Sequence, residues 1–450
     1  MKNKTIIYIV IIIVLTIILG VFWYLIINNN SSSKSNSNSN SNSNNSNSHN
    51  NSKSNTSITY SSSKEINKDE EISEGSFSSS KTDENAILVT GNIKSTLSNI
   101  SVDKTGDSDG GDNTSFYGTN SAILAKDGAT VTIKNVTINT NATGANGVFS
   151  YGGSAKTNNS NSDGTTVNIS DSTITTLKGN SGGIMTTGGG ITNAKNLTIT
   201  TNGQSSAAIR SDRGGGTVNV DGGTYTSNGV GSPAIYSTAD INVKNAKLIS
   251  TTSEGVIIEG KNSINLENVE LIDTHTKNVK SKTYKNIFIY QSMSGDAAEG
   301  VATFSAKDST ITTNNGDTIY VSNTSAIINL ENNKFINKDS NGYFLRLQKD
   351  SWGKEGSNGG NATLNLTNQE VNGNIGVDEI SSLVMNMKSS TFKGIIDAKD
   401  GEVKLTLDKN SKITLTGDSY ITSLDNEDST NSNINLNGYK LYVNGVEFNK

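Results

Sequence analysis

From residue 86 onward, short runs in which apolar and polar residues alternate return repeatedly along the chain. The clearest unit is a pair of runs separated by a tight bend, as in DINVKNAKL at 240–248, where Ile241, Val243 and Leu248 are apolar. Alternation with a period of two predicts β-strands that bury one face. Thirteen such pairs can be aligned. The regular copies are TVTIKNVTI (130–138), TVNISDSTI (166–174), TVNVDGGTY (217–225), DINVKNAKL (240–248), SINLENVEL (263–271), IINLENNKF (327–335) and TLNLTNQEV (363–371), and the weaker ones end at Val102, Ile199, Ile311, Phe392, Ile413 and Leu441.

One position in each pair carries a residue that tolerates a left-handed backbone. It lies three residues before the final apolar position, where two copies have Gly222 and Gly438 and one has Ser389. The other ten copies have Asn99, Asn135, Asp171, Asn196, Asn245, Asn268, Asp308, Asn332, Asn368 and Asn410. Asn, Asp and Gly are the residues that adopt this conformation most easily. We therefore expect one bend at the same place in every repeat, and a ladder of these side chains about 4.8 Å apart.

A third alternating run precedes most of these pairs, which makes three strands per repeat. The third runs are NGVFSY (146–151), GGIMTT (182–187), AAIRSD (207–212), PAIYST (233–238), EGVIIE (254–259), KNIFIY (285–290) and DTIYVS (317–322). Because one coil cannot bury its apolar face alone, successive coils must stack. The sequence thus predicts an all-β protein, a parallel β-helix of about 13 coils that is roughly 60 Å long at about 4.8 Å per coil.

The coil length, the bend position and the three-strand layout over residues 86–441 resemble the right-handed parallel β-helix repeats of the pectin-lyase-like superfamily, particularly those of adhesin-like surface proteins. The resemblance implies a right-handed helix. It leaves the activity open, because this fold hosts lyases, hydrolases, lectin-like binders and inert stalks. At the C-terminus, YKLYVNGVEF (439–448) predicts a hairpin around Asn444-Gly445 that would cap the last coil. We assign residues 86–450 to the β-helix and this cap.

The N-terminus predicts a membrane anchor followed by a flexible tether. Residues 6–27 form an uncharged apolar run of 22 residues, which as a helix would be about 33 Å long and would cross a bilayer. Lys2 and Lys4 precede the run, which places residues 1–27 as a cytoplasmic tip and transmembrane helix, with the β-helix extracellular. A cleaved signal peptide is the alternative. Residues 28–85 are rich in Ser and Asn, and we expect a disordered linker there.

Composition narrows the possible chemistry. The chain has no cysteine and two histidines, His49 and His275, which argues against thiol catalysis, disulfides and histidine-based metal centres. The net charge of −5 and the lack of a basic stripe predict no nucleic-acid partner. We expect no cofactor other than a possible Ca²⁺ at Asp107, Asp109 and Asp112, where a solvated loop is the simpler interpretation. The sequence does not indicate an oligomeric state.

The third runs place an unusual number of aromatic side chains on one outward face. The candidate binding residues there and in the following insertion are Phe149, Tyr151, Tyr236, Phe288, Tyr290, Tyr320, Arg346 and Trp352. Insertions at 152–164, 291–302 and 348–361 leave the chain beside this face. In one interpretation these loops cover the rings as a second hydrophobic cluster. In the other the rings line an open groove in which sugars stack.

Three alternatives compete with binding: an enzyme, an ice-binding protein and a structural stalk. Arg210, Asp212 and Arg213 are weak catalytic candidates for a polysaccharide lyase or hydrolase, although one carboxylate falls short of the pair that glycosidases use. A Thr-x-Thr column at Thr173, Thr198 and Thr224 resembles ice-binding solenoids, and a purely structural stalk is the simplest alternative. Our expectation is a non-catalytic, membrane-anchored extracellular protein for adhesion or carbohydrate binding.

The anchor leads to a first prediction. The mature protein should keep residues 1–27 and should stay in the membrane fraction after washing with high salt or alkali, because the apolar run is held by the bilayer core. Fractionation and N-terminal sequencing of the mature chain measure this. A mature N-terminus near residue 28 would show a cleaved signal instead.

Overall fold

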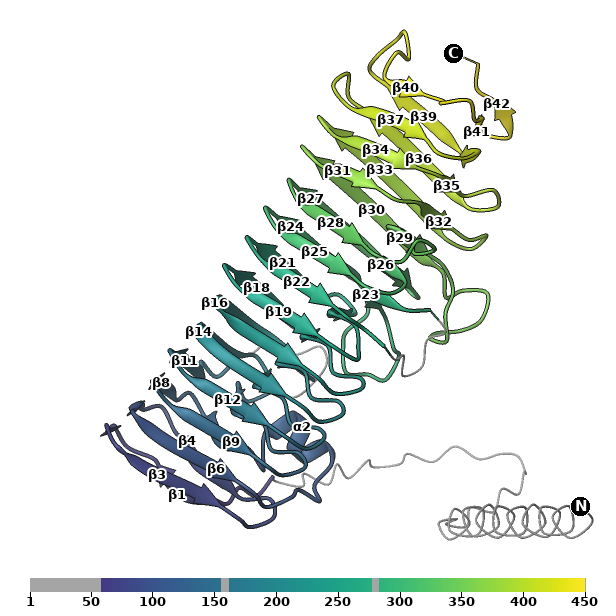
Figure 1. Cartoon of the computed structure of the whole chain (residues 1–450). Coiled ribbons are helices and arrows are strands. Elements are labelled where there is room, and N and C mark those ends of the chain that lie inside the picture. Colours follow the sequence, from purple (N-terminus) through teal and green to yellow (C-terminus); the bar gives the residue numbers. More distant parts are fainter. Residues whose placement is uncertain (1–57, 155–161, 277–282, 450) are drawn as a thin grey trace, which may run out of the picture. The chain divides into compact units, whose positions relative to one another are not determined.

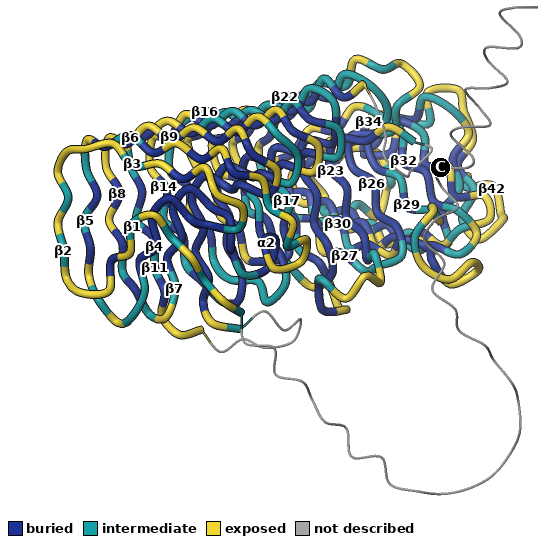
Figure 2. The backbone as a smooth tube through the Cα atoms, turned by 90° about the horizontal axis from the view of Figure 1, so that it is seen from below, coloured by how far each residue is buried: buried dark blue, intermediate teal, exposed yellow. Residues whose placement is uncertain are grey.

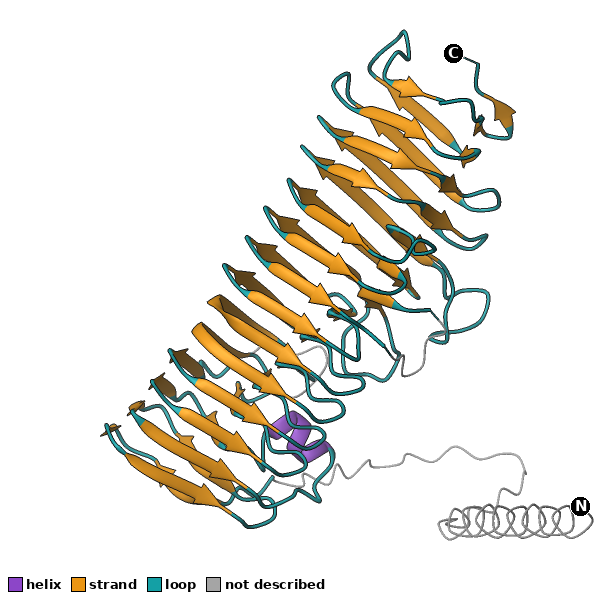
Figure 3. Cartoon of the chain, viewed as in Figure 1, coloured by secondary structure: helices purple, strands orange, loops and turns teal. Residues whose placement is uncertain are grey.

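The computed structural model describes residues 58–154, 162–276 and 283–449. The predicted transmembrane segment 6–27 and most of the Ser/Asn-rich segment lie outside the described residues. Among the described residues, no helix is both long enough and apolar enough to cross a membrane. The described chain is almost entirely β-strand and turn (Figure 3).

The strands stack in three parallel columns, and each column takes one strand from each successive coil (Figure 1). In the described ranges the first column is a sheet of 13 strands, which fits a parallel β-helix of many coils. Its strands are β1 (Ser62–Ile66), β4 (Asn85–Thr90), β7 (Ile123–Lys126), β10 (Val148–Tyr151), β13 (Ile184–Thr187), β15 (Ile209–Ser211), β17 (Ile235–Ser237), β20 (Val256–Glu259), β23 (Lys285–Tyr290), β26 (Asp317–Ser322), β29 (Leu345–Leu347), β32 (Ile375–Val377) and β35 (Ile396–Asp397).

The second column follows the first after a short turn in most coils and after a longer loop in three of the described ones, between β10 and β11, β23 and β24, and β29 and β30. Its strands are β2 (Glu70–Ile72), β5 (Lys94–Ser98), β8 (Thr130–Lys134), β11 (Thr166–Ser170), β14 (Gly190–Thr201), β16 (Gly216–Ser227), β18 (Asp240–Lys244), β21 (Ser263–Glu267), β24 (Val301–Lys307), β27 (Thr324–Glu331), β30 (Gly360–Thr367), β33 (Ser382–Lys388), β36 (Glu402–Leu407) and β39 (Ser423–Asn426).

The third column begins after the predicted bend, and β14 and β16 run through the bend into it. Its other strands are β3 (Gly75–Ser79), β6 (Ile100–Lys104), β9 (Thr137–Thr140), β12 (Thr173–Thr176), β19 (Lys247–Ser250), β22 (Glu270–Asp273), β25 (Thr310–Thr313), β28 (Lys334–Asn337), β31 (Glu370–Asn372), β34 (Thr391–Gly394), β37 (Lys412–Leu415) and β40 (Ile434–Asn435). Three further strands and a short helix complete the described elements: β38 (Ser419–Ile421), β41 (Leu441–Val443), β42 (Val446–Glu447) and α2 (Asp112–Tyr117).

Neighbouring coils pair in parallel and in register, which is the arrangement of a parallel β-helix. Ile241 of β18, for example, lies between Val218 of β16 and Ile264 of β21. Along the strands of the second and third columns, buried residues alternate with intermediate or exposed ones, whereas most residues of the first column are buried (Figure 2). Ile241, Val243 and Leu248 are buried, as the alternation predicted. The core is thus a continuous column of mainly aliphatic side chains inside the stack, with a few aromatic ones such as Tyr225 and Phe304.

The β-helix begins earlier than expected. Residues 62–79 form a first coil, β1 to β3, that pairs with the strands of the next coil. The boundary predicted at residue 86 is therefore wrong, and the disordered linker predicted over 28–85 does not extend through these strands. Each strand of this coil contributes a single large apolar residue, Ile66, Ile72 or Phe77. That is too weak an alternation to stand out in a polar segment.

The predicted left-handed bends are present. Asn245 has a φ of 55° and Asn135 a φ of 54°, and their amides donate hydrogen bonds to Asp221 and Asn99 of the preceding coil, at 2.7 and 2.6 Å. Asn410 is the exception, since it is not among the residues with positive φ. There Asp408 accepts the backbone N–H of Ser411 and a different turn forms.

The terminal hairpin is also confirmed. β41 and β42 pair antiparallel, with Tyr442 opposite Glu447 and Val443 opposite Val446. Asn444 and Gly445 have φ of 49° and 76°, the left-handed pair that favours a two-residue hairpin. β38 pairs with β41 in parallel, so the hairpin continues the stack at its C-terminal end.

The bends lead to a second prediction. Asn245→Ala should lower the free energy of unfolding by about 1–2 kcal/mol, because a non-glycine residue without a local side-chain bond is strained in this conformation. Asn245→Gly should lose less, since glycine keeps the backbone relaxed. Urea unfolding followed by circular dichroism measures both.

Asn410→Ala is the matched control, because Asn410 is exposed and its φ is not positive. Its effect should stay within about 0.5 kcal/mol. If Asn245→Ala proves as mild as this control, the left-handed bend does not contribute to stability as argued.

Candidate functional site

The candidate aromatic residues lie in two separate covered clusters on the first column. The N-terminal ring cluster contains Phe149 and Tyr151, packed with Leu88, Leu124 and Met185. The C-terminal ring cluster contains Phe288, Tyr290 and Tyr320, packed with Ile257 and against Tyr236 and Trp352. Tyr290 stacks on Phe288 with ring centroids 4.4 Å apart. Within each cluster the rings therefore pack against one another, as in a hydrophobic core.

These rings are not available as a binding surface in the described conformation. Phe149 and Tyr320 have no exposed area and Phe288 is 4% exposed. These buried rings therefore do not line an open groove: Tyr60 and Tyr117 pack against the N-terminal ring cluster, and Trp352 of the loop 348–361 packs against the C-terminal one. Arg346 is also occupied, because its guanidinium donates to both carboxylate oxygens of Asp317, at 2.6 and 3.1 Å.

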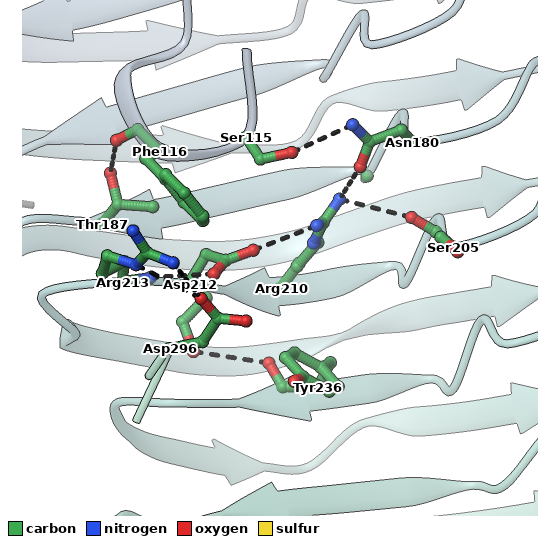
Figure 4. Close-up of polar contacts among 12 residues, drawn as sticks. Ser115, Phe116, Asn180, Thr187, Ser205, Arg210, Asp212, Arg213, Tyr236 and Asp296 are labelled. Atoms are coloured by element: carbon green, nitrogen blue, oxygen red, sulfur yellow. Dashed lines mark hydrogen bonds and ion pairs between the residues drawn. The ribbon is translucent and has the colours of Figure 1, made fainter. Parts of the chain in front are cut away.

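Between the two clusters lies a group of paired charges (Figure 4). The Arg210 guanidinium donates to Asn180 Oδ1 at 2.7 Å and to Asp212 Oδ2 at 3.0 Å. Arg213 donates to Asp296 at 2.7 Å and lies over the Phe116 ring, 4.0 Å from its centroid. The structure thus brings together the three residues named as catalytic candidates and adds a carboxylate, Asp296, from the loop 291–302.

Burial dominates the electrostatics of this group. It raises the pKa of Asp212 to about 6, against the opposing effect of Arg210, and Asp296 adds to the increase. Next to these paired charges, Tyr236 and Ser292 both donate hydrogen bonds to Glu259, which is buried. Arg210, Tyr236 and Asp296 line a pocket of about 230 Å³.

The arrangement is better suited to holding a loop than to catalysis. Two guanidiniums neutralise two carboxylates, and Asp296 and Ser292 fix the loop 291–302 at two points. A glycosidase instead needs two carboxyl groups that flank an accessible bond. Asp212 and Asp296 are each paired with an arginine.

The three aspartates considered for Ca²⁺ make separate contacts. Asp107 accepts from the backbone N–H of Thr143 at 2.7 Å and from Lys178 Nζ at 2.9 Å. A hydrogen bond with Asp83 raises the pKa of Asp109, and Asp112 is the first residue of α2. Within the described ranges no three acidic or histidine side chains come together as a metal site.

An exposed column of amides on the second column of strands was missed by the sequence analysis. Asn193 donates to Asn168, Asn219 to Asn193, Asn242 to Asn219 and Asn265 to Asn242, at 2.9, 2.9, 3.0 and 2.9 Å. These five residues line a surface groove of about 610 Å³, which we call the amide groove. Lys195, Asp221, Lys244 and Glu267 also line it.

The same column continues toward the C-terminus. Asn365 donates to Asn329 and Asn386 to Asn365, both at 2.9 Å. A signal for this column was present in the aligned repeats, because Asn occupies the middle outward position of TVNIS, TVNV, DINV, SINL, IINL and TLNL.

The predicted threonine column on the third column of strands has the expected register. Thr173 pairs with Thr198, and Thr198 with Thr224. Lys247 and Glu270 then replace threonine, and their side chains form an ion pair at 2.9 Å. The regular hydroxyl surface is therefore short.

Comparison of the chain with known protein families, curated proteins and solved structures finds no match.

The paired charges lead to a third prediction. Asp296→Ala removes the Arg213 partner and should loosen the loop 291–302, so that cleavage after Glu299 by a glutamate-specific protease becomes several-fold faster. Limited proteolysis followed by mass spectrometry measures this rate.

Glu447→Ala is a suitable control, because it removes an exposed ion pair, Lys440–Glu447, at the C-terminal hairpin. It should leave cleavage after Glu299 unchanged. Equal cleavage of Asp296→Ala and the unmodified chain would mean that Asp296 does not hold the loop.

Proposed function

We propose that this chain is a non-catalytic surface protein whose β-helix binds an extended, hydroxyl-rich polymer such as a neutral glycan along the amide groove. Residues 6–27 would hold it in the membrane, with the β-helix outside the cell. The observation that supports this most directly is the ladder from Asn168 to Asn265, which crosses five coils of the stack.

The ladder leaves hydrogen-bonding capacity facing solvent. Each side-chain amide has two N–H donors and an oxygen that accepts two bonds. Within the ladder, Asn219 uses one N–H and one oxygen lone pair for its neighbours. The remaining donor and acceptor of each residue can pair with hydroxyl groups, which also donate and accept. The groups repeat at the coil spacing of about 4.8 Å, so a linear polymer could meet several in turn.

The ladder also reduces the cost of binding. Amides already fixed by their neighbours lose little side-chain entropy when a ligand contacts them. The charges beside the groove alternate in sign between Lys195, Asp221, Lys244 and Glu267, and Asp221 and Lys244 lie 3.9 Å apart. This favours a neutral polymer over a polyanion or a polycation.

A lyase or hydrolase is the alternative, and the covered charge pairs at Arg210 and Asp212 count against it. The resemblance to pectin-lyase-like and adhesin-like β-helices agrees with either function, and with a right-handed coil.

The proposal gives a fourth prediction. The double variant Asn219→Ala, Asn242→Ala should weaken binding to a neutral polysaccharide about tenfold or more, because several hydrogen bonds worth about 0.5–1.5 kcal/mol each are lost. Glycan-array screening identifies the ligand, and titration of the purified full chain with it measures the affinity.

Asn202→Ala, Asn228→Ala is the matched control, since these two amides form an exposed pair at 2.9 Å that does not line the groove. It should bind normally. Unchanged affinity in the groove variant, or no glycan binding by the unmodified chain, would contradict the proposal.

A further inference from the structure

Lys285 and Asp350 form a buried ion pair inside the C-terminal ring cluster. Lys285 is the first residue of β23, and Asp350 belongs to the loop 348–361. Lys285 Nζ lies 3.2 Å from Asp350 Oδ2, and the two side chains are 0% and 6% exposed. Most other ion pairs of the described chain are far more exposed, such as Lys349–Glu379 at 51% and 53%.

The surroundings of this pair are apolar and aromatic. Lys285 Nζ lies 3.9 Å from the centroid of the Phe288 ring and 4.7 Å from that of Tyr320. Burial lowers the pKa of Lys285, against the effect of the nearby carboxylates. Keeping both groups charged in apolar surroundings costs free energy, because the ions lose their hydration. Transfer of the proton from nitrogen to oxygen leaves a neutral amine beside a neutral carboxylic acid.

We propose that Lys285 and Asp350 react with each other in the folded protein to form an amide bond between Nζ and Cγ. After proton transfer, the Nζ lone pair attacks the Asp350 carboxyl carbon. A C–N bond forms, the C–OH bond breaks, and a second proton passes from the nitrogen to the departing hydroxyl. One water molecule leaves, and nothing is oxidised or reduced. The fixed pair and the exclusion of water favour this condensation.

Glu254 is the candidate carrier of the second proton. Val256 pairs with Ile287 in register, so Glu254 lies beside Lys285 on the neighbouring coil. Its side chain is buried and accepts a hydrogen bond from Ser253 at 2.7 Å. Asp317 also acts on Lys285, but both of its oxygens are held by Arg346. Asp317 is therefore a poor alternative as carrier or as the acylating group.

The amide would make the cover over the C-terminal ring cluster permanent. It joins the strand β23 to the loop that carries Trp352, which packs against Tyr290 with ring centroids 5.1 Å apart. The loop 348–361 could then not open when the protein is pulled or partly unfolded. This inference is independent of the proposed binding function.

The test is a tryptic map of the full chain purified from membranes and denatured before digestion. Acylated Lys285 resists trypsin, so the expected product is the peptide 283–307 linked to the peptide 350–354, DSWGK. Its mass should be the sum of the two peptides minus one water. Free 286–307 and free 350–354 should be largely absent.

Variants make the test specific. Lys285→Arg keeps a cation next to Asp350 but cannot form the amide, so it should release both peptides. Lys349→Arg alters the exposed pair with Glu379 and should leave the linked peptide unchanged.

Glu254→Gln should leave a several-fold larger unlinked fraction, and full linkage in that variant would overturn the role given to Glu254. Complete recovery of free 286–307 and 350–354 from the folded, unmodified chain would overturn the bond itself and leave an ion pair only.

Discussion

The structure depends on one constraint: equivalent residues of successive coils must lie directly above one another at the spacing of hydrogen-bonded strands, about 4.8 Å. Register between Val218, Ile241 and Ile264 fixes the position of every other residue in those coils. A slip by one residue would turn the inward side chains outward. The left-handed bend at positions such as Asn245 prevents that slip, because it fixes where the second strand ends and the third begins.

The same stacking constraint determines the pattern of side chains on the outer surface of the β-helix. Because each outward position repeats at one spacing, a single residue type in the repeat becomes a continuous column across many coils. The amide groove and the threonine column both arise in this way. The loops escape the constraint, since insertions after the first column need not match between coils. Two ion pairs with little exposure each join a first-column strand residue, Arg210 or Lys285, to a carboxylate that lies after a strand of that column, Asp212 or Asp350.

Much of the fold could be predicted from the sequence because it depends on local patterns. The alternation around Ile241 predicts an extended strand, and the Asn at 245 predicts a left-handed bend. The first coil was missed because Ile66, Ile72 and Phe77 are single apolar residues in polar strands, recognisable only from the coil that pairs with them.

The site could be predicted less well. Outward alternation placed Phe288 and Tyr320 on one face correctly. It could not show that Trp352 and Asp350 fold back over them, since loop conformation depends on contacts between residues far apart in the chain. The pairing of Arg213 with Asp296 joins residues from different coils and had no local signal.

The asparagine ladder of the amide groove also has a direction. Every amide from Asn193 to Asn265 donates to the residue of the preceding coil, and Asn365 and Asn386 do the same. Their dipoles are therefore aligned head to tail, and each bond polarises the next. The surface thus distinguishes the two ends of the stack electrically as well as by shape. A chain molecule with unlike ends would meet a different sequence of donors and acceptors in each of its two orientations, so the column could select one of them.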